Sequence, residues 1–178
     1  MRVLVVYESM YGNTHTVADH IGAGFGDGDE VLVVSVRDAL ELPIDTFDLL
    51  VVGGPTHAHG VSTFASRKSA QEAAEKDEQL ELDPDAPGLG LRDWFKTLEG
   101  HQRFAAAFDT RIDAPAAITG RASKGIGRRL QKRHFHLLVE PESFLVDKHN
   151  HLLDGEADRA TEWGRSLATA LSATMSSH

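Results

Sequence analysis

The strongest constraint on the fold is a regular alternation of short apolar runs with stretches of helical periodicity. Three early runs are dominated by Val and Leu with little polar alternation: Arg2–Tyr7, Glu30–Val36 and Asp48–Gly53. Strands that are buried on both faces of a parallel sheet have this composition. Between the first two runs, apolar residues at helical spacing predict a helix over Thr14–Phe25 that ends at Gly26–Gly28.

The same alternation continues toward the end of the chain. Further strands are expected at Phe104–Phe108 and at Phe135–Val139, the latter resuming through Phe144–Val146 after an interruption at Pro141. Further helices are expected at Thr63–Glu75, Leu91–Leu98 and Glu156–Leu171, the last capped by Asp154 and followed by a frayed tail at Ser172–His178. The pattern predicts one α/β domain over residues 1–178, with a doubly wound parallel sheet and helices on both faces.

Composition narrows the possible functions. The 178 residues include 27 acidic and 18 basic side chains, giving a formal net charge of −9 that argues against nucleic acid or an anionic membrane as a partner. No apolar run is long enough to span a bilayer, and the N-terminal run is too short for a signal peptide, so we expect a cytoplasmic protein. Cysteine is absent, which excludes disulfides and thiolate-bound metals.

The segment after the first strand has the features of a phosphate-binding loop. It reads Tyr7-Glu8-Ser9-Met10-Tyr11-Gly12-Asn13-Thr14. A polar turn leads directly into a helix, whose N-terminal N–H groups and dipole favour an anion. No Lys or Arg lies between Arg2 and Arg37, so neutral donors would hold the phosphate. The segment matches neither the Rossmann fingerprint nor the P-loop, and an ordinary helix cap is the alternative interpretation.

Ser9-Met10-Tyr11-Gly12-Asn13-Thr14 resembles the flavin-phosphate loop of the flavodoxin family. The resemblance extends over nearly the whole chain and implies a five-stranded sheet in the order 2-1-3-4-5. It also implies that FMN is the cofactor and that its phosphate is wrapped by Ser9, Met10, Tyr11, Gly12, Asn13 and Thr14. Tyr11 stands where the commonest flavodoxin pattern has Thr.

Two further loops would meet the flavin ring. The third strand ends in Gly53-Gly54-Pro55-Thr56-His57-Ala58-His59-Gly60, similar to the Gly-x-Pro-Thr loop of flavodoxin-like reductases. The resemblance implies ring contacts from Pro55, Thr56, His57, Ala58 and Gly60. At the end of the fourth strand it implies contacts from Phe108, Asp109, Thr110 and Arg111, with Asp109 and Thr110 bonding the ring and Arg111 near its charge. Neither loop has the Trp or Tyr that sandwiches the ring in single-electron flavodoxins. No metal site is expected at His57-x-His59.

Two charged segments remain without a clear role. Six basic residues fall between Arg121 and Arg133 with no acid among them, either as a solvated helix face or as a patch for nicotinamide phosphates or an acidic partner. Seven acids lie in Glu72–Gly90, a segment whose second half reads as a surface loop that either covers the flavin or lies outside it.

These features favour an FMN-binding redox protein that transfers electrons to or from a partner. One alternative is an FMN-dependent NAD(P)H:quinone-type oxidoreductase, which would be an enzyme with an open pocket above the flavin. A second is a non-redox binding module with this fold and no flavin. A phospho-acceptor receiver domain has the same strand order, but it requires an acidic cluster that Glu8 alone does not supply.

Overall fold

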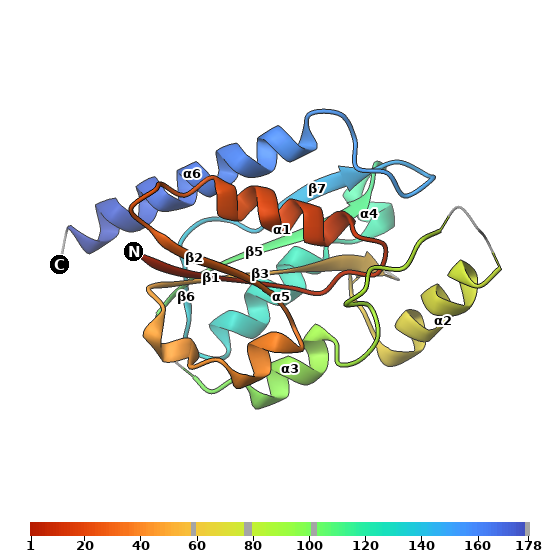
Figure 1. The fold of residues 1–178 in the computed structure, drawn as a ribbon, viewed down its shortest axis with the longest axis horizontal. Coiled ribbons are helices and arrows are strands. Elements are labelled where there is room, and N and C mark those ends of the chain that lie inside the picture. Colours follow the sequence, from red (N-terminus) through yellow and green to blue (C-terminus); the bar gives the residue numbers. More distant parts are fainter. Residues whose placement is uncertain (58–59, 77–79, 101–102, 177–178) are drawn as a thin grey trace.

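The computed structural model describes residues 1–57, 60–76, 80–100 and 103–176, and its centre is a twisted, mainly parallel β-sheet (Figure 1). The strands are β1 (Arg2–Tyr7), β2 (Glu30–Ser35), β3 (Leu49–His57), β4 (Gly60–Val61), β5 (Phe104–Ile112), β6 (His136–Leu137) and β7 (Glu142–Val146). The α-helices are α1 (Asn13–Ala23), α2 (Phe64–Ala74), α3 (Leu91–Thr97), α4 (Ala116–Thr119), α5 (Ala122–Gln131) and α6 (Glu156–Met175). Short 3₁₀ helices lie at Asp38–Glu41 and Ile44–Thr46.

The sheet has the order β2-β1-β3-β5-β6, and β7 also pairs with β5. β6 lies parallel to the beginning of β5, with Phe104 opposite His136, and β7 lies parallel to its end, with Thr110 opposite Phe144. β6 and β7 therefore share the fifth position of the sheet on either side of Pro141. The predicted doubly wound fold and the order 2-1-3-4-5 are confirmed, with β4 added as a short antiparallel partner of β3.

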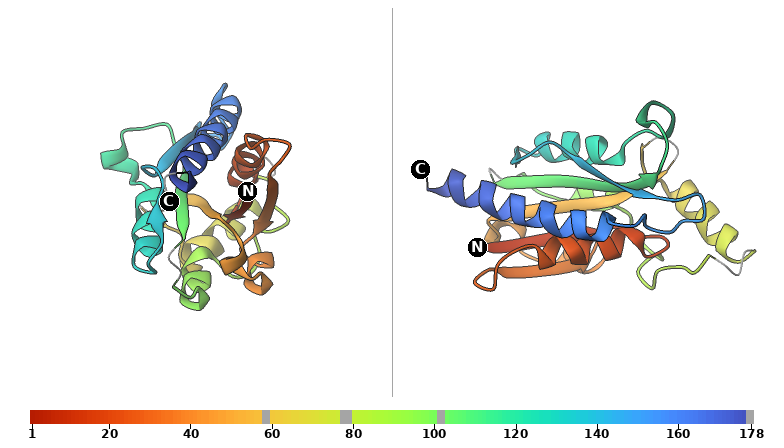
Figure 2. Two further views of the ribbon diagram at one scale, coloured as in Figure 1. Left: turned by 90° about the vertical axis from the view of Figure 1, so that its left-hand side faces the viewer. Right: turned by 90° about the horizontal axis from the view of Figure 1, so that it is seen from above.

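Helices cover both faces of the sheet, as Figure 2 shows. On one face, Val3, Val5 and Phe108 pack in a single cluster with the apolar side chains of α1 and α6. On the other face, Leu4 and Val6 pack with α3 and α5. Consecutive residues of β1 are thus buried on opposite faces, which explains its continuous apolar run. The expectation that Glu30–Val36 is buried on both faces is wrong, because β2 is the edge strand and exposes Glu30 and Leu32. α2 projects beyond the end of β3 and covers neither face (Figure 1).

α1 and α6 pack closely because two glycines lie at their contact. A Cβ on Gly164 would lie 2.2 Å from the carbonyl oxygen of Ile21, and one on Gly24 would lie 2.2 Å from that of Thr161. Backbone at such distances leaves no room for a side chain. The contact holds the end of α1, around Ile21 and Gly24, against α6.

Several element boundaries differ from the sequence prediction. β3 and β5 continue to His57 and Ile112, because their last residues pair with each other or with β4 and β7. The N-cap of α6 is Gly155, at a φ of 83°, rather than Asp154. α6 also continues through Met175 into the expected tail, since the fully buried Leu171 anchors its last turns. Within the described residues, no helix is long and apolar enough to cross a membrane.

Candidate functional site

A cleft of about 210 Å³ opens at the carboxyl ends of the strands, where open α/β sheets bind their ligands. Four chain segments meet there: the first loop, the end of β3, the end of β5 and the turn after β7. The lining residues are Met10, Tyr11, Asn13, Thr14, Pro55, Thr56, His57, Thr110, Arg111, Ile112, Val146, Asp147, Lys148 and Asn150. The structure therefore brings all three predicted loops together and adds a fourth.

The first loop is shaped by a hydrogen bond across its turn. The backbone N–H of Gly12 donates to the hydroxyl oxygen of Ser9 over 3.1 Å, and Gly12 has a φ of 86°, which a side chain would disfavour. α1 begins at the next residue, Asn13, so its unpaired N–H groups start at the cleft. Ser9 is buried and Gly12 supplies backbone, so both shape the loop without lining the cleft.

Two hydrogen bonds join the first loop to distant parts of the chain. The hydroxyls of Thr14 and Thr110 lie 2.7 Å apart, and both side chains are buried. The amide of Asn13 donates to the carbonyl oxygen of Asn150 over 2.7 Å. The start of α1 is thus fixed to the end of β5 and to the turn after β7, which gives the cleft a defined width.

Two basic residues that are distant from the first loop in the sequence line the cleft. Arg111 donates through Nη1 to the carbonyl oxygen of Ala114 at 2.7 Å, while its buried Nε has no hydrogen-bond partner among the described residues. Lys148 is exposed at the rim. From the sequence we expect neutral donors alone to bind the phosphate, and Lys148 has no predicted role. The resumption of the fifth strand through Val146 was the available signal, because it carries the next residues to the same edge of the sheet.

His57 is the titratable group of the third-strand loop. Its Nε2 is buried without a hydrogen-bond partner among the described residues, and it lines the cleft. Burial lowers the pKa of the His57 imidazole, while the nearby Glu8 carboxylate acts in the opposite direction. The ring is therefore neutral at pH 7, with one nitrogen free to bond a ligand. Gly60, the first residue of β4, pairs with His57 at the end of β3. Ala58 and His59 lie outside the described residues.

Two residues of the predicted fourth-strand set point away from the cleft. Phe108 is fully buried in the core, edge-on to Phe144. Asp109 is also fully buried, and its Oδ2 accepts from the backbone N–H of Ser123 at 2.7 Å and from the Thr56 hydroxyl at 3.1 Å. Because side chains alternate along a strand, the cleft receives Thr110 while Asp109 turns beneath the start of α5. Asp109 thus bonds to Ser123 and Thr56 within the protein, whereas the sequence predicted a bond to the flavin.

Comparison with known families agrees with this architecture. The sequence profile of the flavodoxin family matches residues 5–112, from β1 to the end of β5. The chain belongs to the flavodoxin family. The match covers the first loop and the ends of β3 and β5, three of the four segments that form the cleft. No curated protein sequence matches the chain.

Solved structures similar to this flavodoxin-family chain show the same fold. A flavodoxin from the domain Archaea is 19% identical with a TM-score of 0.63, and the match covers 97% of this chain and 99% of that one. Oxidised flavodoxin 1 from Bacillus cereus is 18% identical with a TM-score of 0.63, covering 95% and 98%. Rubredoxin oxygen:oxidoreductase from Desulfovibrio gigas is 17% identical with a TM-score of 0.63, covering 98% of this chain and 37% of that one.

Flavodoxins bind FMN, and the residues of the cleft fit that group. The N-terminus of α1 and the cations Arg111 and Lys148 suit a phosphate, while the unpartnered Arg111 Nε and His57 Nε2 suit polar atoms of a ligand. Family membership and these donors together support an FMN-binding redox flavoprotein.

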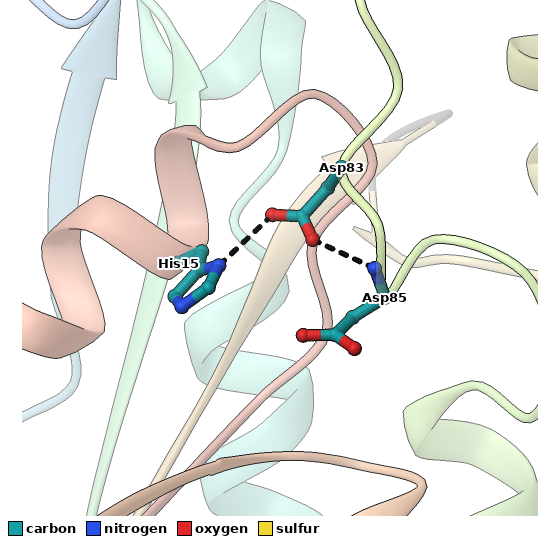
Figure 3. A group of neighbouring side chains, drawn as sticks. All are labelled: His15, Asp83 and Asp85. Carbon is teal, nitrogen blue, oxygen red and sulfur yellow. Dashed lines mark hydrogen bonds and ion pairs between the residues drawn. The ribbon is translucent and has the colours of Figure 1, made fainter.

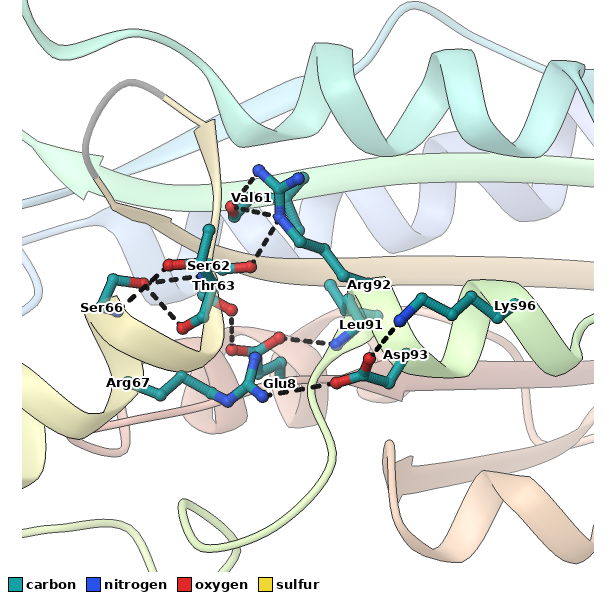
Figure 4. Close-up of polar contacts among 10 residues, drawn as sticks. All are labelled: Glu8, Val61, Ser62, Thr63, Ser66, Arg67, Leu91, Arg92, Asp93 and Lys96. Carbon is teal, nitrogen blue, oxygen red and sulfur yellow. Dashed lines mark hydrogen bonds and ion pairs between the residues drawn. The ribbon is translucent and has the colours of Figure 1, made fainter.

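Behind the first loop, Glu8 joins three elements of this flavodoxin-family chain (Figure 4). The Ser62 hydroxyl donates to Glu8 Oε1, and the backbone N–H of Leu91 donates to Oε2 at 2.7 Å. Arg67 lies beside this carboxylate, is 4% exposed, and pairs with Asp93 at 3.5 Å. Glu8 does not line the cleft, and its bonds fix the end of β1 to the start of α3.

The described part of the acidic segment lies beside the first loop rather than in the cleft. The backbone N–H of Asp83 donates to the carbonyl oxygen of Met10 at 2.8 Å, and none of the described residues after α2 in this segment lines the cleft. His15 Nδ1 lies 3.2 Å from Asp83 Oδ2, as Figure 3 shows. The Tyr7 hydroxyl donates to Asp85 at 2.7 Å, and burial, with this bond, raises the pKa of Tyr7.

The ligand atoms of His15, Asp83 and Asp85 all lie within 4.8 Å of one another, so these residues could together hold a metal ion. Each already has a protein partner, and the His15 ring stacks on Tyr7 at 4.3 Å. We therefore interpret the group as a clamp that holds residues 83–85 against the first loop.

Proposed function

We propose that this chain binds FMN in the cleft at the carboxyl ends of the strands and transfers electrons to or from a partner protein. The observation that carries the proposal is the meeting of the α1 N-terminus, Arg111 and Lys148 in one cleft with the ends of β3 and β5. In a chain of the flavodoxin family, this set of donors matches a phosphorylated flavin.

Bound FMN supplies the redox chemistry, and the residues of the chain supply its position and surroundings. At the phosphate end, the N–H groups of α1 and the charges of Arg111 and Lys148 bind and orient the group. At the ring end, neutral His57 offers a nitrogen as donor or acceptor without adding charge. The bond between Thr14 and Thr110 fixes the start of α1 against the end of β5.

The cleft is open enough for a bound flavin to exchange electrons with a partner. Its volume of about 210 Å³ is below the range of about 300–1,000 Å³ that encloses a drug-sized ligand, so a flavin bound here keeps part of its surface exposed. An exposed flavin suits exchange with a partner protein. The net charge of −9 favours a partner with a basic surface.

The first test is the visible absorption spectrum of the purified protein before and after addition of FMN. Flavin bands shifted from those of free FMN support the site, and a colourless protein that takes up no FMN favours the non-redox binding module. Titrations with FMN and with riboflavin then examine the phosphate end. Lys148→Ala should weaken FMN about threefold and leave riboflavin unchanged, because an exposed charge pair is worth about 0.2–1 kcal/mol. The control variant is Lys124→Ala, which removes one exposed Lys outside the cleft.

The second test separates carrier from reductase. Oxidation of NAD(P)H by the FMN-loaded protein is measured with and without a quinone. A carrier shows negligible turnover under both conditions and becomes active when a reductase partner is added. Rapid quinone-dependent turnover by the protein alone would instead establish the NAD(P)H:quinone-type oxidoreductase.

A further inference from the structure

A second cleft, of about 520 Å³, is lined by α3 and the end of α5, the helices on the face of the sheet opposite α1 and α6. It shares no lining residue with the cleft at the carboxyl ends of the strands. Among the described residues that line it, five are cationic and none is acidic: Arg92, Lys96, Arg129, Lys132 and Arg133. We call this the basic cleft.

Three guanidinium groups of the basic cleft are held by neutral acceptors. Arg92 donates to the carbonyl oxygens of Val61 and Ser62 at 2.9–3.1 Å (Figure 4). Arg129 donates to the carbonyl oxygen of Gly125 at 2.9 Å, and Arg133 to that of Leu98. Carbonyl oxygens fix the direction of a guanidinium without cancelling its charge. These side chains are therefore positioned in advance while their positive potential remains.

Little of the charge is neutralised by nearby carboxylates. Within the described parts of the chain, Lys96 alone of the five forms an ion pair, with Asp93 at 2.8 Å. Burial, with the neighbouring Arg92, lowers the pKa of Arg129, so the two guanidinium groups repel each other. In a chain with a net charge of −9, such a concentration of like charge is unfavourable until an anion enters.

We infer that the basic cleft binds a small polyphosphate anion, the chemistry shared by a nucleoside polyphosphate and inorganic pyrophosphate. Its volume lies within the range of about 300–1,000 Å³ that is typical of small-molecule sites. Guanidinium forks match phosphate oxygens in pairs, and Lys96 and Lys132 add mobile point charges at the rim. The concave shape suits a compact anion better than an extended acidic surface. The inference does not depend on FMN binding.

Isothermal titration calorimetry tests this with pyrophosphate and with ATP, in the presence of excess FMN so that the other cleft is not available. The variant Arg129→Ala/Lys132→Ala removes two cations of the basic cleft. Its matched control, Lys124→Ala/Arg128→Ala, removes one Lys and one Arg of the same helix that do not line the cleft. A second variant, Lys96→Ala/Lys132→Ala, changes only exposed side chains and is used if the first fails to fold.

At least one probe is expected to bind, with an affinity that falls as salt rises. The cleft variants should weaken it about tenfold, and the control should change it less than about twofold. Tighter binding of ATP identifies a nucleoside polyphosphate as the ligand, and tighter binding of pyrophosphate identifies the inorganic anion. The inference is overturned if neither probe binds with a dissociation constant below about 1 mM. An equal loss of affinity in the cleft variant and in the Lys124→Ala/Arg128→Ala control would also overturn it. So would binding of a polyglutamate peptide by a protein that binds neither pyrophosphate nor ATP.

Discussion

The hydroxyls of Thr14 and Thr110 are 96 positions apart in the sequence and 2.7 Å apart in the structure. Thr14 lies in the first turn of α1 and Thr110 near the end of β5, two elements joined mainly through the sheet. Both side chains are buried, so the bond lies in the wall of the cleft and is screened from water. This pair couples the position of the α1 N-terminus to that of the end of β5.

Replacement of Thr110 by Val should weaken both the fold and the binding of FMN. The change preserves the shape of the side chain but leaves the buried Thr14 hydroxyl without this partner, at a cost of about 1–3 kcal/mol in the free energy of unfolding. FMN affinity should also fall about tenfold, which corresponds to a loss of about 1.4 kcal/mol in the free energy of binding. Urea unfolding and flavin titration measure the two effects.

Thr97→Val is the control for this prediction. The Thr97 hydroxyl donates to the carbonyl oxygen of Trp94 at 2.8 Å on α3, away from the cleft. FMN affinity should be unchanged in this variant. If Thr110→Val binds FMN as tightly as the unmodified protein, the pair has no part in the site.

His57 predicts a pH dependence of stability. Its pKa is lowered in the folded protein, first by burial, so on acidification the unfolded chain takes up a proton at this residue before the folded protein does. The free energy of unfolding therefore falls as the pH drops below the unfolded value of about 6.5, and above that value His57 contributes no slope. Urea midpoints between about pH 5 and pH 8 should show this fall, and His57→Gln should reduce it.

His149→Gln is the matched control, because His149 is exposed in the turn after β7. The slope of stability against pH in this variant should equal that of the unmodified protein. An identical slope in His57→Gln would show that the imidazole is not responsible for the dependence.

The sequence predicted the fold well because both faces of β1 are buried, which leaves an unmistakable apolar run at Arg2–Tyr7. It also predicted the first loop, where the residues that shape the site are consecutive. It could not predict the direction of Asp109, because the partner that draws this side chain inward, the backbone of Ser123, belongs to a helix whose position only the fold determines. For the same reason the sequence could not predict that Arg92 and Arg129, which lie on different helices, line one cleft.

Asp109 should prove more important for stability than for flavin binding. Asp109→Ala removes the acceptor for the Ser123 N–H and the Thr56 hydroxyl, leaving buried donors unpaired. The free energy of unfolding should fall by about 3 kcal/mol, whereas the exposed Asp113→Ala should change it by less than about 0.5 kcal/mol. The FMN affinity of the folded fraction should change little. A large loss of affinity with unaltered stability would instead assign Asp109 to the flavin.

Gly164→Ala should push α6 away from the end of α1. The added Cβ would lie 2.2 Å from the carbonyl oxygen of Ile21, a backbone atom that cannot move away without shifting α1. Such overpacking costs about 1–3 kcal/mol or more, which should appear as a lower urea midpoint. Because Ile21 lies at the end of α1 remote from the cleft, the FMN affinity of the folded protein should change little. Gly28→Ala is the control, since its Cβ would meet no atom within 4 Å, and it should leave both quantities unchanged. An unchanged midpoint in Gly164→Ala would mean that α6 packs against α1 less closely than the structure indicates.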